Sequence, residues 1–422
     1  MKVKHLRLNS FRGFDELTLE FSADSPTVII GNNGVGKSSI LDCLATLLSW
    51  LIYPLKSQPG INFIGTKDIK AGRDKLEAEI TLSLDERSLI TWSISNVALE
   101  NNAERINHNL QQLTPLIDGI KQHLSAGSPL NLVLVVYYPV NRSVMDMPLE
   151  MPENYDFNQF DAYKQALGEA KIGFQSFFHW FRALEDLENE ERRDKPDYCE
   201  KKLEAVRQAI YALIPEFSNL RVRRNPLRMT VTKKANKKAE EFSLEQLSDG
   251  EKCLLAMVGD LARRLALANP CLEQPLQGSG IVLIDELELH LHPAWQRQII
   301  PRLTQTFPNC QFIVTTHSPQ ILSHVKPENV YCLKTPETGI KAVHPENSFG
   351  RDSNRILEDL MQVPKRPQEI KDHLQDIFAL IENKDLDRAR ELCQIIAAQI
   401  GSDDPELVKA RTSIRRREIL NK

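Results

Sequence analysis

The sequence predicts an α/β fold organised around a phosphate-binding loop, and two observations support this prediction. First, the stretch GNNGVGKSS at residues 31–39 fits the pattern G-x-x-x-x-G-K-[ST]. Second, the apolar run Val28–Ile30 precedes this stretch, and leucines and isoleucines at helical spacing follow it. The order strand, glycine loop, helix is the context that the pattern requires, so the chain is predicted to bind a nucleoside triphosphate.

The residue types of this loop suit a triphosphate. Glycines let the backbone wrap closely around phosphates, so that its N–H groups point inward. Lys37 brings a positive charge to the terminal phosphates, the Ser38 hydroxyl can ligate Mg²⁺, and the helix N-terminus adds a favourable dipole. The predicted nucleotide contacts are Gly31, Asn32, Asn33, Gly34, Val35, Gly36, Lys37, Ser38 and Ser39.

Composition limits the class of protein. With 422 residues the chain is long enough for two or three domains, and its net charge of −4 gives no global basic field that would indicate nucleic acid. The seven cysteines are scattered without a C-x-x-C pair, which is typical of reduced, cytosolic proteins. The N-terminus does not resemble a signal peptide and no run of 18 apolar residues occurs, so we expect a cytoplasmic protein without a membrane span.

The chain before the loop is predicted to form an antiparallel pair of strands. Residues 2–8 alternate in polarity, with Val3 assigned to one face and Leu6 and Leu8 to the other, and residues 17–21 alternate again. The connection NSFRGF joins the two strands and leads the chain toward the phosphate loop.

The region after the loop helix is predicted to contain a loop, a hairpin, a helix and a strand. Proline and glycine are frequent in residues 50–75, which indicates a loop. Residues 76–84 and 89–94 alternate in polarity like the two strands of a hairpin. We expect residues 98–124 to be helical and residues 130–138 to form a second buried strand.

Two arginines in connecting segments are candidate contacts, Arg12 with a phosphate or a bound strand and Arg142 with a phosphate or a partner. Arg12 lies between the first two strands, and Arg142 follows the strand that ends in YYPVNR. A guanidinium group can clamp a phosphate, but a solvated loop arginine at position 12 and a structural salt bridge at position 142 explain the residues equally well. Both interpretations stay open.

The middle of the chain is predicted to be a helical insertion followed by a basic hairpin. Residues 146–160 are rich in proline and acidic residues, which indicates a linker, and residues 162–213 show a helical pattern interrupted at Pro196. The basic segment at 221–238 is either a solvated hairpin or a patch that contacts nucleic-acid phosphates. Its positive charges are Arg221, Arg223, Arg224, Arg228, Lys233, Lys234, Lys237 and Lys238.

A second anion-binding helix end is predicted just after the basic segment. Ser248 and Asp249 are good N-caps, Gly250 and Glu251 follow, and an apolar stripe at helical spacing continues the helix. The backbone N–H groups at such a helix start attract anions. Its position between the phosphate loop and the next motif makes it a candidate part of the same site.

Two later strands end in residues that can act on a phosphate. Residues 281–286 read IVLIDE, which places Asp285 to bind Mg²⁺ and Glu286 to polarise the attacking water as a general base. Residues 312–316 form another buried strand, and His317 follows it. This histidine either senses the γ-phosphate at the strand's carboxyl end or is only a polar cap.

One histidine pair is assigned to a loop. His290 and His292 stand two residues apart, which is compatible with a metal site, but no third ligand is evident in the sequence.

The C-terminal region is predicted to be helical after a last strand at residues 329–333. Its three amphipathic helices are expected at residues 367–384, 386–400 and 405–420. Together these patterns divide the chain into a first lobe at 1–145, an insertion with the basic hairpin at 146–240, a second lobe at 241–350 and a helical domain at 351–422.

The motifs GNNGVGKSS, LSDGE, IVLIDE and TTHSP, in this order, resemble those of the ABC-type ATPase superfamily. The opening LRLNSFRGF, the strand end YYPVNR and the segment DELELHLHP resemble the soluble branch that contains SMC, RecF and OLD-type ATPases. The resemblance covers residues 1–50, 130–142 and 240–335 and implies an ABC-type ATPase (P-loop NTPase) head that uses ATP and Mg²⁺. It makes residues 31–38 the Walker A motif, Ser248–Glu251 the signature, Asp285 and Glu286 the Walker B motif, and His317 the switch histidine. Asp249 stands where the signature more usually has glycine, and we expect this difference to weaken or retune closure around the nucleotide.

The size, the short insertion and the helical tail most resemble the PtuA-type ATPases of Septu and retron anti-phage systems. This resemblance implies a homodimer or higher homo-oligomer that sandwiches ATP, and a partner nuclease of HNH type. Every motif that can be assigned serves the nucleotide, so we expect the destructive chemistry in another chain, docked on the insertion or on residues 365–422. The alternative is a RecF- or SMC-like DNA-repair ATPase that clamps DNA. A transporter subunit is disfavoured by the FRGF start, the HLHP segment and the large insertion.

Overall fold

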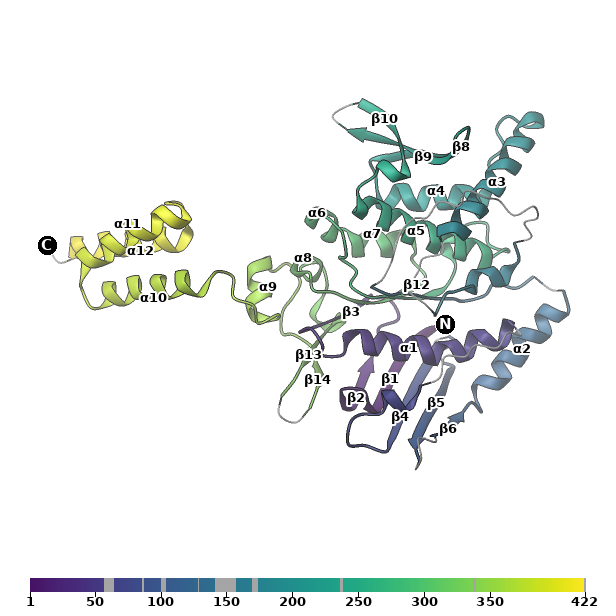
Figure 1. Ribbon diagram of the computed structural model, residues 1–422, viewed down its shortest axis with the longest axis horizontal. Coiled ribbons are helices and arrows are strands. Elements are labelled where there is room, and N and C mark those ends of the chain that lie inside the picture. Colours follow the sequence, from purple (N-terminus) through teal and green to yellow (C-terminus); the bar gives the residue numbers. More distant parts are fainter. Residues whose placement is uncertain are drawn as a thin grey trace. The chain divides into compact units, whose positions relative to one another are not determined.

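The computed structural model describes residues 1–56, 64–85, 87–99, 104–127, 129–140, 157–168, 174–235, 238–336 and 339–420. The chain forms two compact units, Met1–Arg351 and Asp352–Lys422, which are treated separately below. Unit 1, hereafter the head, contains the sheets labelled in Figure 1. Arg142 and Lys237, and most of the predicted linker at 146–160, lie outside the described residues.

The head is built on a six-stranded sheet in the order β14-β13-β3-β12-β11-β7. Five of its strands are parallel to one another, and β14 runs antiparallel at the edge. The parallel strands are buried apolar runs, as a sheet covered on both faces requires. The strands are β3 (Thr27–Gly31), β7 (Leu134–Tyr138), β11 (Gly280–Ile284), β12 (Cys310–Thr315), β13 (Val330–Lys334) and β14 (Lys341–Val343).

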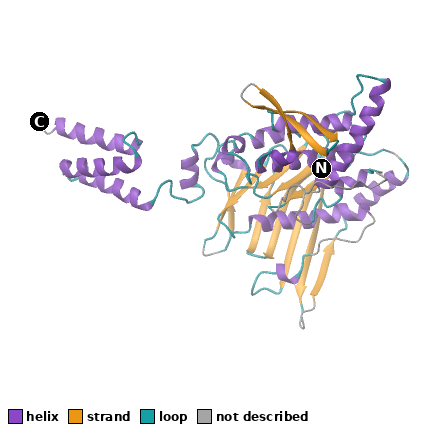
Figure 2. Cartoon of the chain, turned by 45° about the horizontal axis from the view of Figure 1, so that its top comes forward, coloured by secondary structure: helices purple, strands orange, loops and turns teal. Residues whose placement is uncertain are grey.

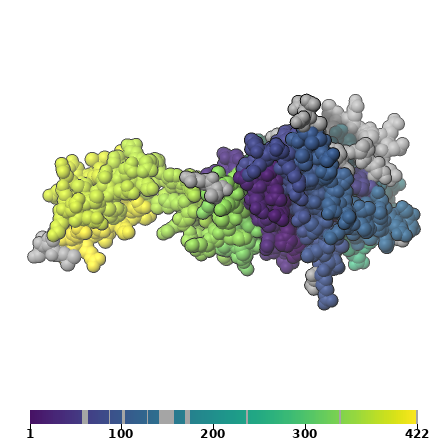
Figure 3. Space-filling model, turned by 90° about the horizontal axis from the view of Figure 1, so that it is seen from below, coloured from purple at the N-terminus to yellow at the C-terminus, as the bar shows by residue number. Residues whose placement is uncertain are grey.

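A second sheet is antiparallel, with the strand order β2-β1-β4-β5-β6. The predicted N-terminal pair and the predicted hairpin are both confirmed within it. In the space-filling view the N-terminal part of the chain, purple to blue, forms one continuous face of the head (Figure 3). The strands are β1 (Lys2–Phe11), β2 (Phe14–Glu20), β4 (Lys75–Ser83), β5 (Leu89–Ala98) and β6 (Glu104–Asn109).

Helix α1 (Lys37–Ile52) packs against strands of both sheets, including β4 and β7. Two-sided packing explains why its apolar residues are spread around the helix and are nearly all buried. Among the described residues, the stretch Lys37–Lys56 is the one helical segment long and apolar enough to cross a membrane, and 67% of its apolar window is buried in the head. Such burial is what the core helix of a globular head requires.

Two of the predictions in this region were wrong. The expected helix at 98–124 contains strand β6, which pairs with β5, and only α2 (Leu113–Ser125) is helical. Hydrogen bonds from β5 stabilise β6 at the edge of the sheet, although the polarity of the β6 residues does not alternate. Val3 was assigned to the opposite face from Leu6 and Leu8, but all three are buried on the same face of β1. The register shift between Val3 and His5 moves Val3 onto that face.

The insertion contains α3 (Phe174–Asp194) and α4 (Lys201–Leu213), and the predicted break at Pro196 is confirmed. The start of the predicted helical stretch was wrong, since residues 159–163 form only a short 3₁₀ turn. The basic segment forms a three-stranded antiparallel sheet, hereafter the small sheet, which leads into the long buried helix α5 (Asp249–Ala268). Its strands are β8 (Phe217–Arg224), β9 (Leu227–Ala235) and β10 (Lys238–Ser243).

Short helices complete the head. The α-helical ones are α6 (Pro293–Gln296), α7 (Ile299–Thr306) and α8 (Pro319–Leu322). The described 3₁₀ turns are η1 (Tyr53–Lys56), η2 (Thr66–Asp68), η4 (Gln159–Tyr163), η5 (Leu244–Gln246), η6 (Pro275–Gln277) and η7 (Pro327–Asn329). Residues 50–75 are therefore not wholly loop, because α1 extends to Ile52 and two 3₁₀ turns follow.

The second unit, Asp352–Lys422, is helical. It contains α9 (Ser353–Asp359), α10 (Gln368–Glu382), α11 (Leu386–Ile400) and α12 (Pro405–Leu420), so the three predicted amphipathic helices are confirmed. The last three pack together as a bundle (Figure 2). Its buried core consists of Leu374, Ile377, Ile381, Ala389, Cys393, Ile396, Leu407, Ala410 and Ile414.

Candidate nucleotide site

The phosphate loop lies at the carboxyl end of β3, between the neighbouring strands β13 and β12. Open α/β sheets bind ligands at this end of their strands. Gly34 and Gly36 have φ values of 78° and 104°, which side chains disfavour, and a Cβ on Gly36 would lie 2.6 Å from the Phe14 ring. A Cβ on Gly31 would lie 2.8 Å from the Leu333 carbonyl oxygen, so glycine is required at these positions.

Lys37 is the buried cation of the loop. Its Nζ donates hydrogen bonds to the carbonyl oxygens of Gly31 and Asn32, at 3.0 and 3.1 Å. Burial lowers the pKa of this ammonium, although the charges of Asp285 and Glu286 oppose the shift. The ammonium therefore lies over the loop where phosphate oxygens would replace the two carbonyl partners, which fits the chemistry of a triphosphate site.

Asp285 follows β11 directly and is only 2% exposed. Thr315, at the end of the adjacent strand β12, donates its hydroxyl hydrogen bond to Asp285 Oδ1. The backbone N–H of Glu286 in turn donates to the same Thr315 hydroxyl at 2.8 Å, and Glu286 has a positive φ of 46°. The pairing of β11 with β12 thus fixes both acidic residues at the edge where β3 ends.

These donors fit a magnesium ion as well as the nucleotide. Ser38, exposed at the start of α1, and the buried carboxylate of Asp285 offer the oxygen ligands that Mg²⁺ prefers. When bound, the ion neutralises charge on the phosphates. The structure holds the Lys37 ammonium against the loop and the Glu286 backbone at the strand end, the positions that the predicted phosphate contact and the predicted general base require.

Sequence reasoning missed two residues of this site, Thr315 and Glu288. Glu288 accepts hydrogen bonds from the Thr316 hydroxyl, at 2.6 Å, and from the backbone N–H of His317. This carboxylate fixes the backbone at His317, which the structure places beyond the end of β12. The available signals were the two threonines before His317 and the third carboxylate of DELE, Glu288. They become meaningful only when β11 and β12 are known to be adjacent.

Arg12 lies against the beginning of α1. Its guanidinium forms ion pairs with Asp42 at 2.7 Å and Asp68 at 2.8 Å, and it donates to the Ser39 hydroxyl at 3.2 Å. Burial opposes its charge, but the two carboxylates outweigh this effect and raise its pKa. Arg12 is thus next to the loop helix and already paired, and its predicted contact with the nucleotide stays a prediction.

The predicted second anion site is the N-terminus of α5. The hydroxyl of Ser248 and the side chain of Glu251 form a reciprocal capping box, and Ser248 is exposed. Asp249 is also exposed, with 82% of its side chain in solvent. Gly250 faces the opposite way, since a Cβ there would lie 2.3 Å from the carbonyl oxygen of His290. This contact requires glycine at position 250, whereas the exposed position 249 has room for an aspartate side chain.

The histidine pair behaves as a loop element. His290 has a positive φ of 63°, and His292 Nδ1 accepts a hydrogen bond from the backbone N–H of Ala294, which caps α6. Within the described ranges, no group of three or more His, Cys, Asp or Glu side chains is arranged to hold a metal ion.

Several charges of the basic segment are paired within the protein. Arg221 and Arg223 both contact Glu241, at 2.9 and 2.6 Å. Lys233 contacts Glu251 at 2.6 Å. Arg224 is paired with Glu185 and Asp186 of α3. In the described part of the chain, the cations of this segment without an ion pair are Arg228, Lys234 and Lys238.

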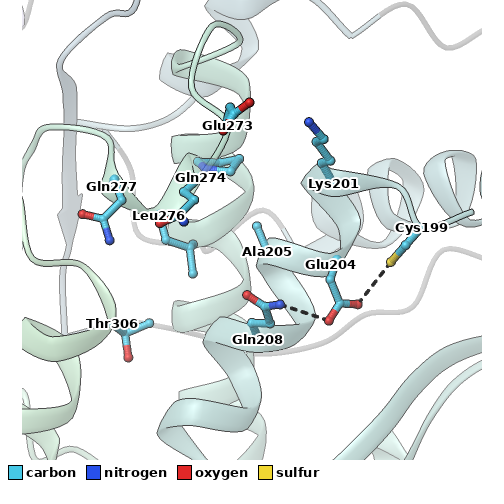
Figure 4. Close-up of a pocket in the computed structure, with 11 residues that line it drawn as sticks. Cys199, Lys201, Glu204, Ala205, Gln208, Glu273, Gln274, Leu276, Gln277 and Thr306 are labelled. Carbon is cyan, nitrogen blue, oxygen red and sulfur yellow. Dashed lines mark hydrogen bonds between the residues drawn. The ribbon is translucent and has the colours of Figure 1, made fainter.

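A cavity of about 600 Å³ lies apart from the phosphate loop, between α4, the η6 segment and α7 (Figure 4). Cys199 lies at its wall, 3.7 Å from Glu204 Oε2. Burial and the Glu204 charge raise the pKa of this thiol, which disfavours a nucleophilic role. The cavity contains none of the predicted site residues.

Comparison with known proteins identifies similar chains. Residues 27–323 match the family model described as AAA domain, putative AbiEii toxin, Type IV TA system, and residues 3–50 match the P-loop containing region of AAA domain. The Retron Ec83 probable ATPase of Escherichia coli is 32% identical, over 99% of this chain and 87% of its own. The Septu protein PtuA of Bacillus thuringiensis is 23% identical, over 85% of this chain and 84% of its own. Among solved structures, the SMC head domain from Thermotoga maritima is 17% identical, with a TM-score of 0.45, over 82% of this chain and 100% of that chain.

Proposed function

The chain belongs to the family described as AAA domain, putative AbiEii toxin, Type IV TA system, and from this membership we propose that it is the regulatory ATPase of an anti-phage defence complex. The predicted membership of the SMC/RecF/OLD-like ABC ATPases, with retron ATPases and PtuA as relatives, is confirmed, and the protein is an ATPase. In the proposed complex, ATP-dependent dimerisation controls a partner nuclease.

The observation that supports the dimer is that the two predicted phosphate-binding elements contact different residues of the head. The loop that holds Lys37 contacts Phe14 and Leu333, whereas the N-terminus of α5 contacts His290 and Lys233. Ser248 at that helix end is exposed and available to a ligand. A second copy of the chain would supply its Ser248 helix end to the triphosphate on the first, which makes two equivalent sites in a closed homodimer.

The second unit supports the assignment of a protein partner. Its bundle leaves large apolar side chains in solvent, among them Ile395, Val408 and Ile419, which is 67% exposed. A protein partner that gathers these side chains into one buried interface would remove them from water. We propose that an HNH-type nuclease docks on residues 365–422 or on the insertion, and that the complex is cytoplasmic.

The rival function, a DNA-repair clamp, is less well supported. Two relatives that match more than nine tenths of the chain are both named retron probable ATPases. The small sheet offers only Arg228, Lys234 and Lys238 as described cations without an ion pair for nucleic-acid phosphates. We propose this surface as a secondary contact to nucleic acid, to be tested by the salt dependence of binding after these three charges are reversed.

Co-expression with the neighbouring gene tests the proposed function. The two proteins should co-elute in size exclusion, and the complex should cleave nucleic acid, while the purified chain should not. ATPase-deficient variants of this chain should change the rate at which the complex cleaves nucleic acid. Metal-dependent cleavage by this chain alone, unaffected by every ATPase variant, would refute the division of labour.

A further inference from the structure

Lys233 on β9 is joined to the first turn of α5 by short polar contacts. Its Nζ lies 2.6 Å from Glu251 Oε1. Glu251 Oε2 accepts hydrogen bonds from the backbone N–H and the hydroxyl of Ser248, at 3.0 and 2.8 Å. The Glu251 side chain is 6% exposed and the Lys233 side chain 32% exposed. The three residues form one connected unit at the N-terminus of α5.

Glu251 is the member of this unit that needs a counter-ion. Burial opposes ionisation of the carboxylate, but the hydrogen bonds from Lys233 and Ser248 outweigh it and lower the pKa, so the group is charged. An ionised carboxylate in the first turn of α5 repels a phosphate that approaches the same helix end. Lys233 supplies the compensating charge.

The small sheet fixes the backbone of Lys233. Strand β9 pairs with β10, with Lys233 opposite Glu240, and β10 continues through η5 to Ser248. Arg221 and Arg223 of the neighbouring strand are both paired with Glu241. Lys233 is therefore the cation of this sheet that contacts Glu251.

We propose that Lys233 is a positioning residue for ATP hydrolysis, because it neutralises and holds Glu251 so that Ser248 and the N–H groups of α5 can receive a triphosphate. The proposal rests on the ATP-dependent dimer proposed above. When Ser248 turns its hydroxyl toward a phosphate, Glu251 loses that donor and keeps the Ser248 N–H and Lys233. The lysine thereby maintains the start of the helix in the ATP-bound dimer.

The first experiment replaces the charge. Lys233→Gln should lower kcat about tenfold or more and weaken ATP-dependent dimerisation, because a buried charge loses its partner. ATP binding at the phosphate loop, measured with a fluorescent ATP analogue, should stay within about twofold, since Lys37 is untouched. Lys233→Arg should restore most of kcat. Lys75→Gln, which removes an exposed strand lysine 3.5 Å from Glu77, is the matched control and should leave kcat unchanged.

The second experiment separates charge compensation from simple stabilisation. The double variant Lys233→Gln/Glu251→Gln should regain much of the kcat lost in Lys233→Gln, because glutamine also completes a capping box and carries no charge. If Lys233 only stabilised the fold, the double variant would be no more active than the single one. Equal activity of Lys233→Gln and wild type would also overturn the proposal.

Ser248→Ala distinguishes failure of this proposal from failure of the dimer. A wild-type rate in Lys233→Gln together with an inactive Ser248→Ala leaves the proposed dimer standing and removes Lys233 from it. If Glu286→Gln never dimerises with ATP and Ser248→Ala hydrolyses ATP normally, the dimer fails and the role of Lys233 fails with it. Thermal melting identifies any variant that does not fold. If Lys233→Gln does not fold, the kcat values of Lys233→Arg and of the double variant decide whether Lys233 acts by compensating the charge of Glu251.

Discussion

The hydroxyl of Thr315 donates a hydrogen bond to Asp285 Oδ1 from the adjacent strand, and it accepts one from the N–H of Glu286. One side chain thus fixes both acidic residues of the site. It does so at a position, Thr315, that is fully buried. The general-base role predicted for Glu286 would therefore depend on a residue of β12.

We expect Thr315→Val to lower kcat about tenfold to a hundredfold, since it leaves a buried carboxylate without a donor and costs about 1–3 kcal/mol. Steady-state ATPase assays measure the effect, and thermal melting checks the fold. Thr304→Val, which removes a hydroxyl bonded to its own helix α7, is the control and should keep the wild-type rate. A fully active Thr315→Val protein would show that the hydroxyl does not position the acidic pair.

Lys37→Ala should weaken ATP binding by about a hundredfold or more, because the triphosphate loses a charge-assisted hydrogen bond at a buried position. Binding of a fluorescent ATP analogue measures this loss. Lys75→Ala removes an exposed lysine from β4 and serves as the control. Retained affinity in Lys37→Ala would remove the residue from the nucleotide site.

Glu286→Gln should bind ATP normally and lose hydrolysis by about a factor of 10² to 10⁴, the usual contribution of a general base. The trapped ATP should hold two chains together, so light scattering after size exclusion should report an ATP-dependent dimer. The double variant Lys37→Ala/Glu286→Gln should not dimerise, which serves as the control. A Glu286→Gln protein that stays monomeric at saturating ATP would contradict the proposed dimer.

Gly250→Ala should destabilise the head by about 1–3 kcal/mol and impair dimerisation, because the added Cβ overlaps the carbonyl oxygen of His290. Gly119→Ala is the matched control: it lies in helix α2 with open space around it, so it should stabilise the protein by up to about 1 kcal/mol. Denaturant unfolding measures both. Equal changes in the free energy of unfolding for the two substitutions would mean that the contact with His290 does not affect stability.

Lys56 predicts a pH dependence of stability. Burial lowers the pKa of this ammonium to about 8 in the folded protein, from 10.5. Between these values the unfolded chain binds more protons than the folded chain, so the free energy of unfolding rises as pH rises through this window. Lys56→Met should flatten that rise, measured as Tm against pH, whereas Lys75→Met, which removes an exposed strand lysine that is not among the causes of this shift, should keep it. An unchanged slope in Lys56→Met would assign the dependence to other groups.

Local patterns in the sequence determine the elements that carry the nucleotide chemistry. The order strand, glycine loop and helix at 27–52 and the acidic strand end at Asp285 follow from apolar runs and motif spacing alone. The same holds for the three C-terminal helices, whose 3.6-residue periodicity is strong. These predictions succeeded because each depends on residues close together in the chain.

Only the tertiary structure decided which distant residues support these elements. It pairs Thr315 with Asp285 and Lys233 with Glu251, and it surrounds Arg12 with Asp42 and Asp68. It also makes residues 104–109 a strand, because they pair with β5, and the local sequence does not predict this pairing. Strand adjacency and ion pairing join segments far apart in the chain, and the free energy of such contacts depends on burial and geometry that no local pattern contains.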